Sequence, residues 1–175
     1  HLAELIMSYF GDGSKLGVNI TYSREEKPLG TAGPLNLIRN QLSSDFILMN
    51  GDILTNLNFK DFIFSHSNSK CLGTIATFPR RVSVDFGVVD IDSREHIIGW
   101  HEKPKKDYFV SMGIYIFNLK TLSFLEEDNY IDLPDLVLNL IKNNECINSY
   151  KHSGYWLDIG REEDYRKACQ KYDKI

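Results

Sequence analysis

Apolar and polar residues follow one another along this chain in blocks that predict strands and helices in turn. Residues 46–49 form a continuous apolar run, which is typical of a strand buried on both faces of a sheet. Residues 1–10 carry apolar side chains at helical spacing. On the same grounds we expect further helices at 34–42, 60–69, 121–126, 136–142 and 162–170, and strands at 18–22, 72–78, 86–91, 97–101, 109–118, 147–151 and 155–157. This order predicts an α/β protein with a mostly parallel sheet.

Composition narrows the range of partners. The chain has 20 Lys and Arg against 24 Asp and Glu, a net charge of -4, and no long basic run, so nucleic acid is not expected as a partner. No apolar stretch reaches the roughly 18 residues that a membrane span needs. Cys71, Cys146 and Cys169 are widely spaced and form no CxxC pair, which argues against a zinc site and a disulfide framework and favours a reducing compartment.

Two aspartates follow predicted strands. Asp52 comes after residues 46–49, beside Gly51, which leaves space, and Asp158 follows an apolar run and precedes Gly160. In open α/β sheets, ligands bind outside the carboxyl ends of the strands. Mg²⁺ prefers a few protein carboxylates together with phosphate oxygens and water. The two acids therefore indicate a magnesium site; the alternative for each is an Asp that caps the turn after it.

Two further segments carry binding chemistry. Glu102-Lys103 stands at a strand end, where the lysine can bind phosphate and the acid can accept sugar hydroxyls; solvated surface charges are the alternative. In residues 30–33, the Gly-rich start of the helix expected at 34–42 has Thr31 as its N-cap and leaves backbone N–H groups free to bind acceptors. A carboxylate nearby, Glu25, would complement the donors of guanine; a structural helix entry is the alternative.

Taken together, these residues resemble the sugar-1-phosphate nucleotidylyltransferase family, and most closely its mannose-1-phosphate guanylyltransferase-like members. The resemblance covers residues 1–168 and rests on EEKPLGTAGPL at 25–35, NGDILTN at 50–56, EKP at 102–104, GIYIF at 113–117 and YWLDIGREEDY at 155–165. It implies a Rossmann-like mixed sheet flanked by helices, of the nucleotide-diphospho-sugar transferase type. The positions that match the family's functional residues are catalytic Asp52, Asp158 and Lys103, with both aspartates on Mg²⁺; nucleotide-binding Glu25, Gly30, Thr31 and Gly51; and sugar-phosphate-binding Gly87, Glu102, Lys103 and Ser111.

The implied reaction joins an NTP, with GTP as the best match, to a sugar 1-phosphate such as mannose 1-phosphate and releases pyrophosphate in the cytoplasm. Family members begin with a strand and a GxGTRLxPxTxxxPK loop that this sequence does not contain. We therefore expect residues 1–175 to be a single nucleotidyltransferase domain that lacks its first strand and has little or no turnover alone. Ser111 and Phe86 depart from the family's Asn-x-Gly and Tyr-Gly, which leaves the sugar open.

Three alternatives accompany this interpretation. Thymidylyl or uridylyl transfer would follow if Glu25 pairs with a different base. A non-catalytic homologue that binds sugar nucleotide and regulates a partner would fit the absent loop, although it would not need both aspartates. A response-regulator-like α/β module built on Asp52 is disfavoured, because the acid-rich amino-terminal loop and the downstream Lys that it needs are not apparent. Whether the protein forms a homo-oligomer is a separate question that the sequence leaves open.

Overall fold

The computed structural model describes the backbone of residues 2–172, and the chain divides into two compact units. The first unit contains His1–Phe46 and Asn118–Cys146, and the second contains Ile47–Phe117 and Ile147–Ile175. Whether the two units act together as one nucleotidyltransferase domain stays a prediction.

The first unit is built from short helices. It contains α1 (Ala3–Phe10), the 3₁₀ turns η1 (Ser14–Leu16), η2 (Gly33–Asn36), η3 (Arg39–Gln41) and η4 (Leu119–Phe124), and α3 (Leu133–Lys142). Helix α3 buries Leu133, Leu136 and Leu140, whose spacing places them on one face of the helix. Helix α1, in contrast, has no buried residue.

The second unit contains the sheet. Its elements are β1 (Phe46–Met49, which begins at the last residue of the first unit), β2 (Ile53–Thr55), α2 (Phe59–Ser69), β3 (Gly73–Ser83), β4 (Val88–Ile91), β5 (Ile97–His101), β6 (Lys105–Phe117), β7 (Ile147–Lys151), β8 (Trp156–Asp158) and α4 (Glu162–Tyr172). The main sheet has the order β1-β6-β3-β7, in which β3 runs antiparallel to β6 and parallel to β7. The expected mixed α/β fold with flanking helices is confirmed.

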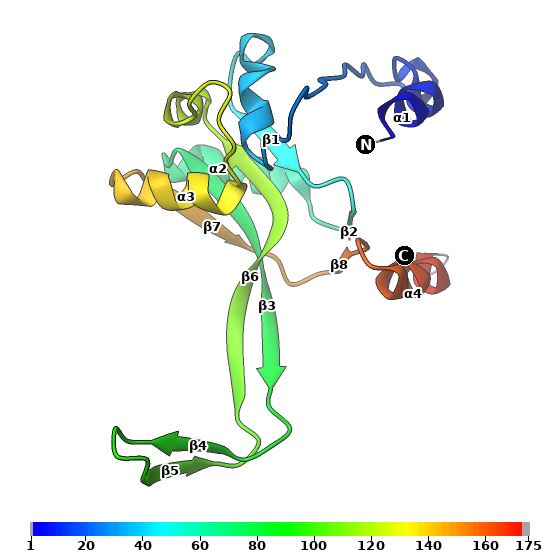
Figure 1. Cartoon of the computed structure of the whole chain (residues 1–175). Helices are drawn as coiled ribbons and strands as arrows, with labels where there is room; N and C mark the ends of the chain where they lie inside the picture. Colours follow the sequence, from blue (N-terminus) through cyan, green and yellow to red (C-terminus); the bar gives the residue numbers. More distant parts are fainter. Residues whose placement is uncertain (1, 173–175) are drawn as a thin grey trace. The chain divides into compact units, whose positions relative to one another are not determined.

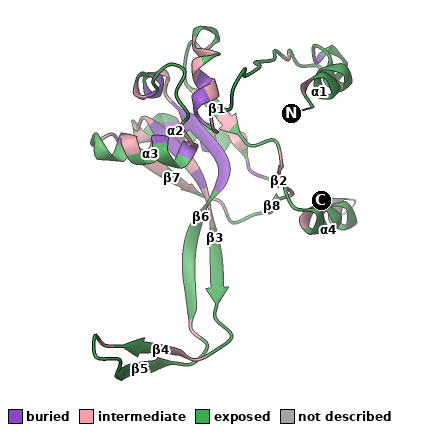
Figure 2. Cartoon of the chain, viewed as in Figure 1, coloured by how far each residue is buried: buried purple, intermediate pink, exposed green. Residues whose placement is uncertain are grey.

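The core of the second unit lies on one face of this sheet. Its buried members are Ile53, Leu57, Phe62, Ala76, Met112, Ile114 and Ile116. Phe62 of α2 is fully buried and contacts the Tyr150 ring of β7, with ring centroids 5.3 Å apart. Figure 2 shows that the buried part of β6 ends where the strand leaves the sheet.

Strands β3 and β6 continue beyond the sheet as a two-stranded ribbon (Figure 1). Their pairing runs from Gly73 opposite Phe117 to Ser83 opposite Lys105, and its register shifts between Ile75 and Thr77. The hairpin of β4 and β5 follows the outer end of the ribbon, and both of its strands lie within the ranges expected at 86–91 and 97–101.

Several expected elements differ from the structure. Residues 34–42 and 121–126 form 3₁₀ turns rather than α-helices, and residues 18–22 do not form a strand. Strand β2 was not predicted, because three residues between a turn and a helix give almost no periodic signal. Within the described residues, no helix combines the length and apolar character needed to cross a membrane.

The expectation of no disulfide is wrong, because Cys71 and Cys146 are disulfide-bonded. Each cysteine comes just before a strand, and these two strands pair in parallel with Gly73 opposite Ile147. Sequence spacing could not show this, because the pairing joins segments more than seventy positions apart. The cysteines therefore no longer favour a reducing compartment, and the cytoplasmic location stays a prediction.

Candidate functional site

Asp52 and Asp158 lie together in the second unit, because β2 and β8 pair antiparallel. The register places Ile53 opposite Asp158, Leu54 opposite Leu157 and Thr55 opposite Trp156. Beyond Ile53, the Ile159 N–H donates to the Asp52 carbonyl over 2.8 Å. Two acids that are 106 positions apart in the sequence are thereby adjacent at one end of a short ladder.

The two carboxylates face a common point beside Gly160. A Cβ built on Gly160 would lie 2.9 Å from Asp52 Oδ2 and 3.1 Å from Asp158 Oδ1. The Gly160 N–H also donates to Asp158 Oδ1 over 2.9 Å, which fixes the orientation of that carboxylate. Only a residue without a side chain leaves this point open.

The donor set fits a magnesium ion. Asp52 is half-buried and Asp158 is exposed, so water and phosphate oxygens can reach the remaining coordination positions. Mg²⁺ is bound in such sites by one or two carboxylates plus substrate phosphates rather than by a closed protein cage. The part of the chain that the structure describes contains no cluster of three or more His, Cys, Asp or Glu side chains that could hold a metal ion.

Gly51, the glycine before Asp52, has open surroundings. A Cβ added there would meet nothing within 4 Å. The space beside Asp52 therefore does not depend on this glycine, whereas the space beside Gly160 does.

The predicted sugar-phosphate residues Gly87, Glu102 and Lys103 lie together at the hairpin of the second unit. A Cβ on Gly87 would lie 2.5 Å from Trp100 Cζ2, and the Trp100 Nε1–H donates to Glu102 Oε2 over 3.2 Å. Lys103 has a φ of 45°, in the left-handed region that non-glycine residues seldom adopt. Such strained positions occur disproportionately at ligand-binding sites.

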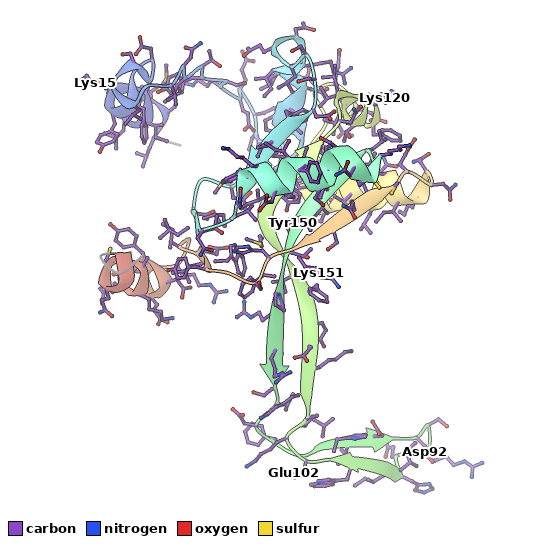
Figure 3. The ribbon with its side chains drawn as sticks, turned by 180° about the vertical axis from the view of Figure 1, so that it is seen from behind. Lys15, Asp92, Glu102, Lys120, Tyr150 and Lys151 are labelled. Atoms are coloured by element: carbon purple, nitrogen blue, oxygen red, sulfur yellow. The ribbon has the colours of Figure 1, made fainter. Side chains whose placement is uncertain are left out.

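This group does not meet the aspartate pair in the structure. Figure 3 shows Glu102 at the outer end of the ribbon, while Tyr150 and Lys151 lie where the ribbon leaves the sheet. The β8 strand is anchored near the sheet, where the Trp156 indole N–H donates to the Met112 carbonyl over 3.1 Å. Lys105 and Ser111 are six positions apart along β6. At about 3.3 Å per residue, the ribbon therefore extends on the order of 20 Å beyond Ser111.

Ser111 lies at the inner end of the ribbon, opposite Thr77. Its hydroxyl donates to the Tyr115 hydroxyl over 3.0 Å and accepts from the Gly113 N–H over 3.3 Å. Gly113 has a φ of 73°, and its carbonyl accepts from the Asn50 N–H over 2.9 Å. Ser111 therefore shapes the loop that precedes Asp52, in addition to its predicted role in the sugar pocket.

The predicted nucleotide-binding residues of the first unit form a tightly bonded loop. The Thr31 N–H and hydroxyl both donate to Asp132 Oδ1, over 2.9 and 3.1 Å, and the Leu133 N–H donates to the Thr31 hydroxyl over 2.8 Å. The hydrogen bond from the Thr31 N–H, together with one from the Tyr130 hydroxyl, holds the pKa of Asp132 below its usual value. Gly30 has a φ of 78°, and a Cβ there would lie 2.5 Å from the Ile131 carbonyl oxygen.

Two expectations for this loop are therefore wrong. Thr31 does not cap a helix at 34–42, because its side chain bonds to the start of α3 instead. The backbone N–H groups of Thr31, Ala32 and Gly33 are not free, since they donate to Asp132 and to the Ile131 carbonyl. Glu25 accepts from the Leu29 N–H over 2.9 Å and borders a cleft of about 580 Å³ between α1 and residues 22–28.

Some residues around the aspartate pair escaped the sequence reasoning. A cleft of about 280 Å³ is lined by Arg80 of β3, Asp164 of α4 and Asp158 itself. Asn56 bonds the backbone before β8 through its side chain. Arg80 gave no signal because it lies in a charged run on an exposed ribbon. Asn56 is the last residue of the NGDILTN motif. Because it lies two residues before Asn58, which caps α2, the sequence suggested only a turn at this point.

The mixed α/β fold with two acids at one end of a short ladder is compatible with a nucleotidyltransferase, and the comparisons with known proteins assign the chain to that class. The family described as Nucleotidyl transferase matches residues 1–175, so the chain belongs to this family. The expected place among sugar-1-phosphate nucleotidylyltransferases is confirmed by its curated relatives.

Three similar proteins illustrate this. UTP--glucose-1-phosphate uridylyltransferase of Synechocystis sp. is 33% identical over 189 residues, covering 97% of this chain and 49% of the relative. Mannose-1-phosphate guanyltransferase of Schizosaccharomyces pombe is 35% identical over 157 residues, covering 85% and 42%. The crystal structure of HddC from Yersinia pseudotuberculosis complexed with GMP-PN is 26% identical with a TM-score of 0.70, covering 97% of this chain and 74% of that one. The chain thus spans less than half the length of these curated relatives.

Proposed function

We propose that the protein that carries this chain transfers a guanylyl group from GTP to a sugar 1-phosphate such as mannose 1-phosphate, and forms a GDP-sugar and pyrophosphate with the help of Mg²⁺. The observation that carries this proposal is the convergence of Asp52 Oδ2 and Asp158 Oδ1 on the open point beside Gly160. A regulatory homologue that only binds sugar nucleotide would not need two acids held in this way.

The reaction asks the protein mainly to position groups and neutralise charge. A phosphate oxygen of the sugar 1-phosphate forms a bond to the α-phosphorus of the nucleotide, and the bond from that phosphorus to the bridging oxygen of pyrophosphate breaks. A bound Mg²⁺ supplies positive charge on the phosphate oxygens. Asp52 and Asp158 would hold that ion, and Lys103 would bind the sugar phosphate as a point charge.

Two observations favour GTP. The Schizosaccharomyces pombe relative is named a mannose-1-phosphate guanyltransferase, and the HddC structure is a complex with GMP-PN, which by its name is a guanine nucleotide. The Glu25 carboxylate borders the cleft of the first unit, where it can accept hydrogen bonds from the N1–H and amino group of guanine. Uridylyl transfer is the second candidate, because the Synechocystis relative uses UTP at similar identity.

A nucleotide panel tests the proposal. Pyrophosphate release is measured with Mg²⁺, with GTP, UTP or dTTP, and with mannose 1-phosphate or glucose 1-phosphate. We expect the highest kcat/KM for GTP with mannose 1-phosphate and no release after Mg²⁺ is chelated. A preference for UTP would replace the guanylyl assignment, and sugar-nucleotide binding without turnover would favour the regulatory homologue.

A further inference from the structure

The segment that leads into β8 is clipped to β2 by one asparagine side chain. Asn56 Oδ1 accepts from the Tyr155 N–H over 2.6 Å, and the Asn56 N–H donates to the Tyr155 carbonyl over 3.2 Å. Asn56 therefore binds both backbone groups of Tyr155. The Thr55 hydroxyl adds a bond to the same carbonyl over 2.9 Å.

The approach of Asn56 requires a glycine on the other side. A Cβ on Gly154 would collide with Asn56 Oδ1 and would lie 2.7 Å from His152 Cε1. The His152 ring contributes as well, because its Nε2 lies 3.2 Å from the Tyr155 carbonyl oxygen. The clip thus consists of the Asn56 side chain on one segment and Gly154 on the other, where the lack of a side chain leaves room for Asn56.

The ladder between this clip and the aspartates is short. Only three residue pairs, from Thr55 opposite Trp156 to Ile53 opposite Asp158, separate the two ends. A ladder of this length is weak by itself, and a slip of one residue would turn every β8 side chain to the opposite face. The bonds of Asn56 at one end therefore fix which side chain meets Asp52 at the other end.

We propose that Asn56 is a positioning residue of the metal site, which sets the separation of the Asp52 and Asp158 carboxylates through the register of β2 and β8. The inference rests on the proposed function, because it takes the two aspartates to be magnesium ligands. Residues that orient metal ligands without binding the metal themselves typically lower metal affinity by about 10- to 100-fold when they are removed.

The test measures metal binding directly, without turnover. Mn²⁺ is titrated into the purified protein, and free Mn²⁺ is followed by electron paramagnetic resonance. We expect Asn56→Ala to raise the Mn²⁺ dissociation constant about tenfold or more. Asn56→Asp keeps an acceptor oxygen for the Tyr155 N–H, so it should restore most of the affinity. Gly154→Ala, which displaces the Asn56 side chain from the other side, should weaken binding like Asn56→Ala.

Asn58→Ala is the matched control. The Asn58 side chain accepts from the Lys60 and Asp61 N–H groups at the start of α2, so its loss should lower the melting temperature and leave Mn²⁺ affinity unchanged. In the metal-free protein, hydrogen exchange at Ile159 should accelerate in Asn56→Ala and stay as in wild type in Asn58→Ala.

The outcomes separate the two proposals. If wild type binds Mn²⁺ and folded Asn56→Ala binds it equally well, the positioning role is wrong and the metal site stands. If wild type itself fails to bind Mn²⁺, both the metal site and this inference are overturned. Equal losses in Asn56→Ala and Asn58→Ala would mean that general destabilisation explains the effect.

Discussion

The second unit contains two groups of predicted site residues that are held in different ways. Asp52 and Asp158 are far apart in the sequence and meet because β2 pairs with β8. Glu102 and Lys103 are neighbours in the sequence and lie on a hairpin at the end of a two-stranded ribbon. The first group is tied to the core by Trp156, which contacts Phe78 with ring centroids 5.4 Å apart, whereas Trp100 at the hairpin is 64% exposed.

This difference shows that the fold alone brings the two aspartates together, while it leaves Glu102 and Lys103 apart from them. Strand pairing with side-chain clips preorganises the aspartates without substrate. The hairpin is joined to the rest of the unit through the two-stranded β3–β6 ribbon, and a two-stranded element is only marginally stable in water by itself. If Lys103 binds sugar phosphate beside the metal, the ribbon has to bring it there.

The largest expected effect is on the preorganised group. Asp52→Asn or Asp158→Asn removes a charged ligand of the metal ion. Because the metal stabilises the transition-state charge by several kcal/mol, turnover in the protein that carries this chain should fall about a thousandfold. Pyrophosphate release measures the loss, and Asp61→Asn on α2 is the control. Near-normal turnover in either variant would remove that aspartate from the metal site.

The two tryptophans of the chain provide the next comparison. Trp156→Ala removes a half-buried ring and its hydrogen bond to Met112, so the free energy of unfolding should fall by about 3 kcal/mol. Trp100→Ala should change it by no more than about 0.5 kcal/mol, because the ring is largely exposed. Denaturant titration gives both values. Equal losses would mean that the hairpin is as firmly packed as β8.

A smaller effect is expected at the hairpin lysine. Lys103→Ala should raise the KM for the sugar 1-phosphate about tenfold with little change in the KM for the nucleotide, since one charge-assisted contact is worth about 1.5 kcal/mol or more. Initial-rate kinetics test this, with Lys105→Ala two residues along the chain as the control. A loss of nucleotide affinity instead would assign Lys103 to a different substrate.

The smallest effect concerns the ribbon between the two groups. The Arg81 guanidinium donates to Asp107 over 2.6 and 2.8 Å, and these hydrogen bonds hold the pKa of Asp107 below its usual value. A lowered folded-state pKa stabilises the fold above the unfolded-state pKa of about 4, and this contribution disappears as the pH falls through the folded-state value. Arg81→Ala should therefore lower the melting temperature slightly at neutral pH and not at acidic pH. A larger difference in melting temperature between Arg81→Ala and wild type at acidic pH than at neutral pH would contradict the lowered pKa of Asp107.

The sequence predicted the sheet better than it predicted the loops. Residues 46–49 form β1 as expected, because a continuous apolar run is a local signal, but the strand is not buried on both faces, since Ile47 and Met49 are exposed. The proximity of Asp52 and Asp158 was also expected, since each follows a predicted strand, although Asp158 proves to be the last residue of β8. The 3₁₀ turns at η2 and η3 were missed because the hydrogen bonds of Thr31 go to Asp132, a partner about a hundred residues away. Asn56 was missed for the same reason, because its partner Tyr155 lies 99 positions away.

The central claim is that Asp52 and Asp158 bind one divalent ion between them. Crystals of the protein soaked in Mn²⁺ test it directly, because anomalous scattering locates the ion without reference to activity. We predict a single peak beside Gly160 that contacts both carboxylates. A peak on only one aspartate, or separate peaks on each, would contradict the claim.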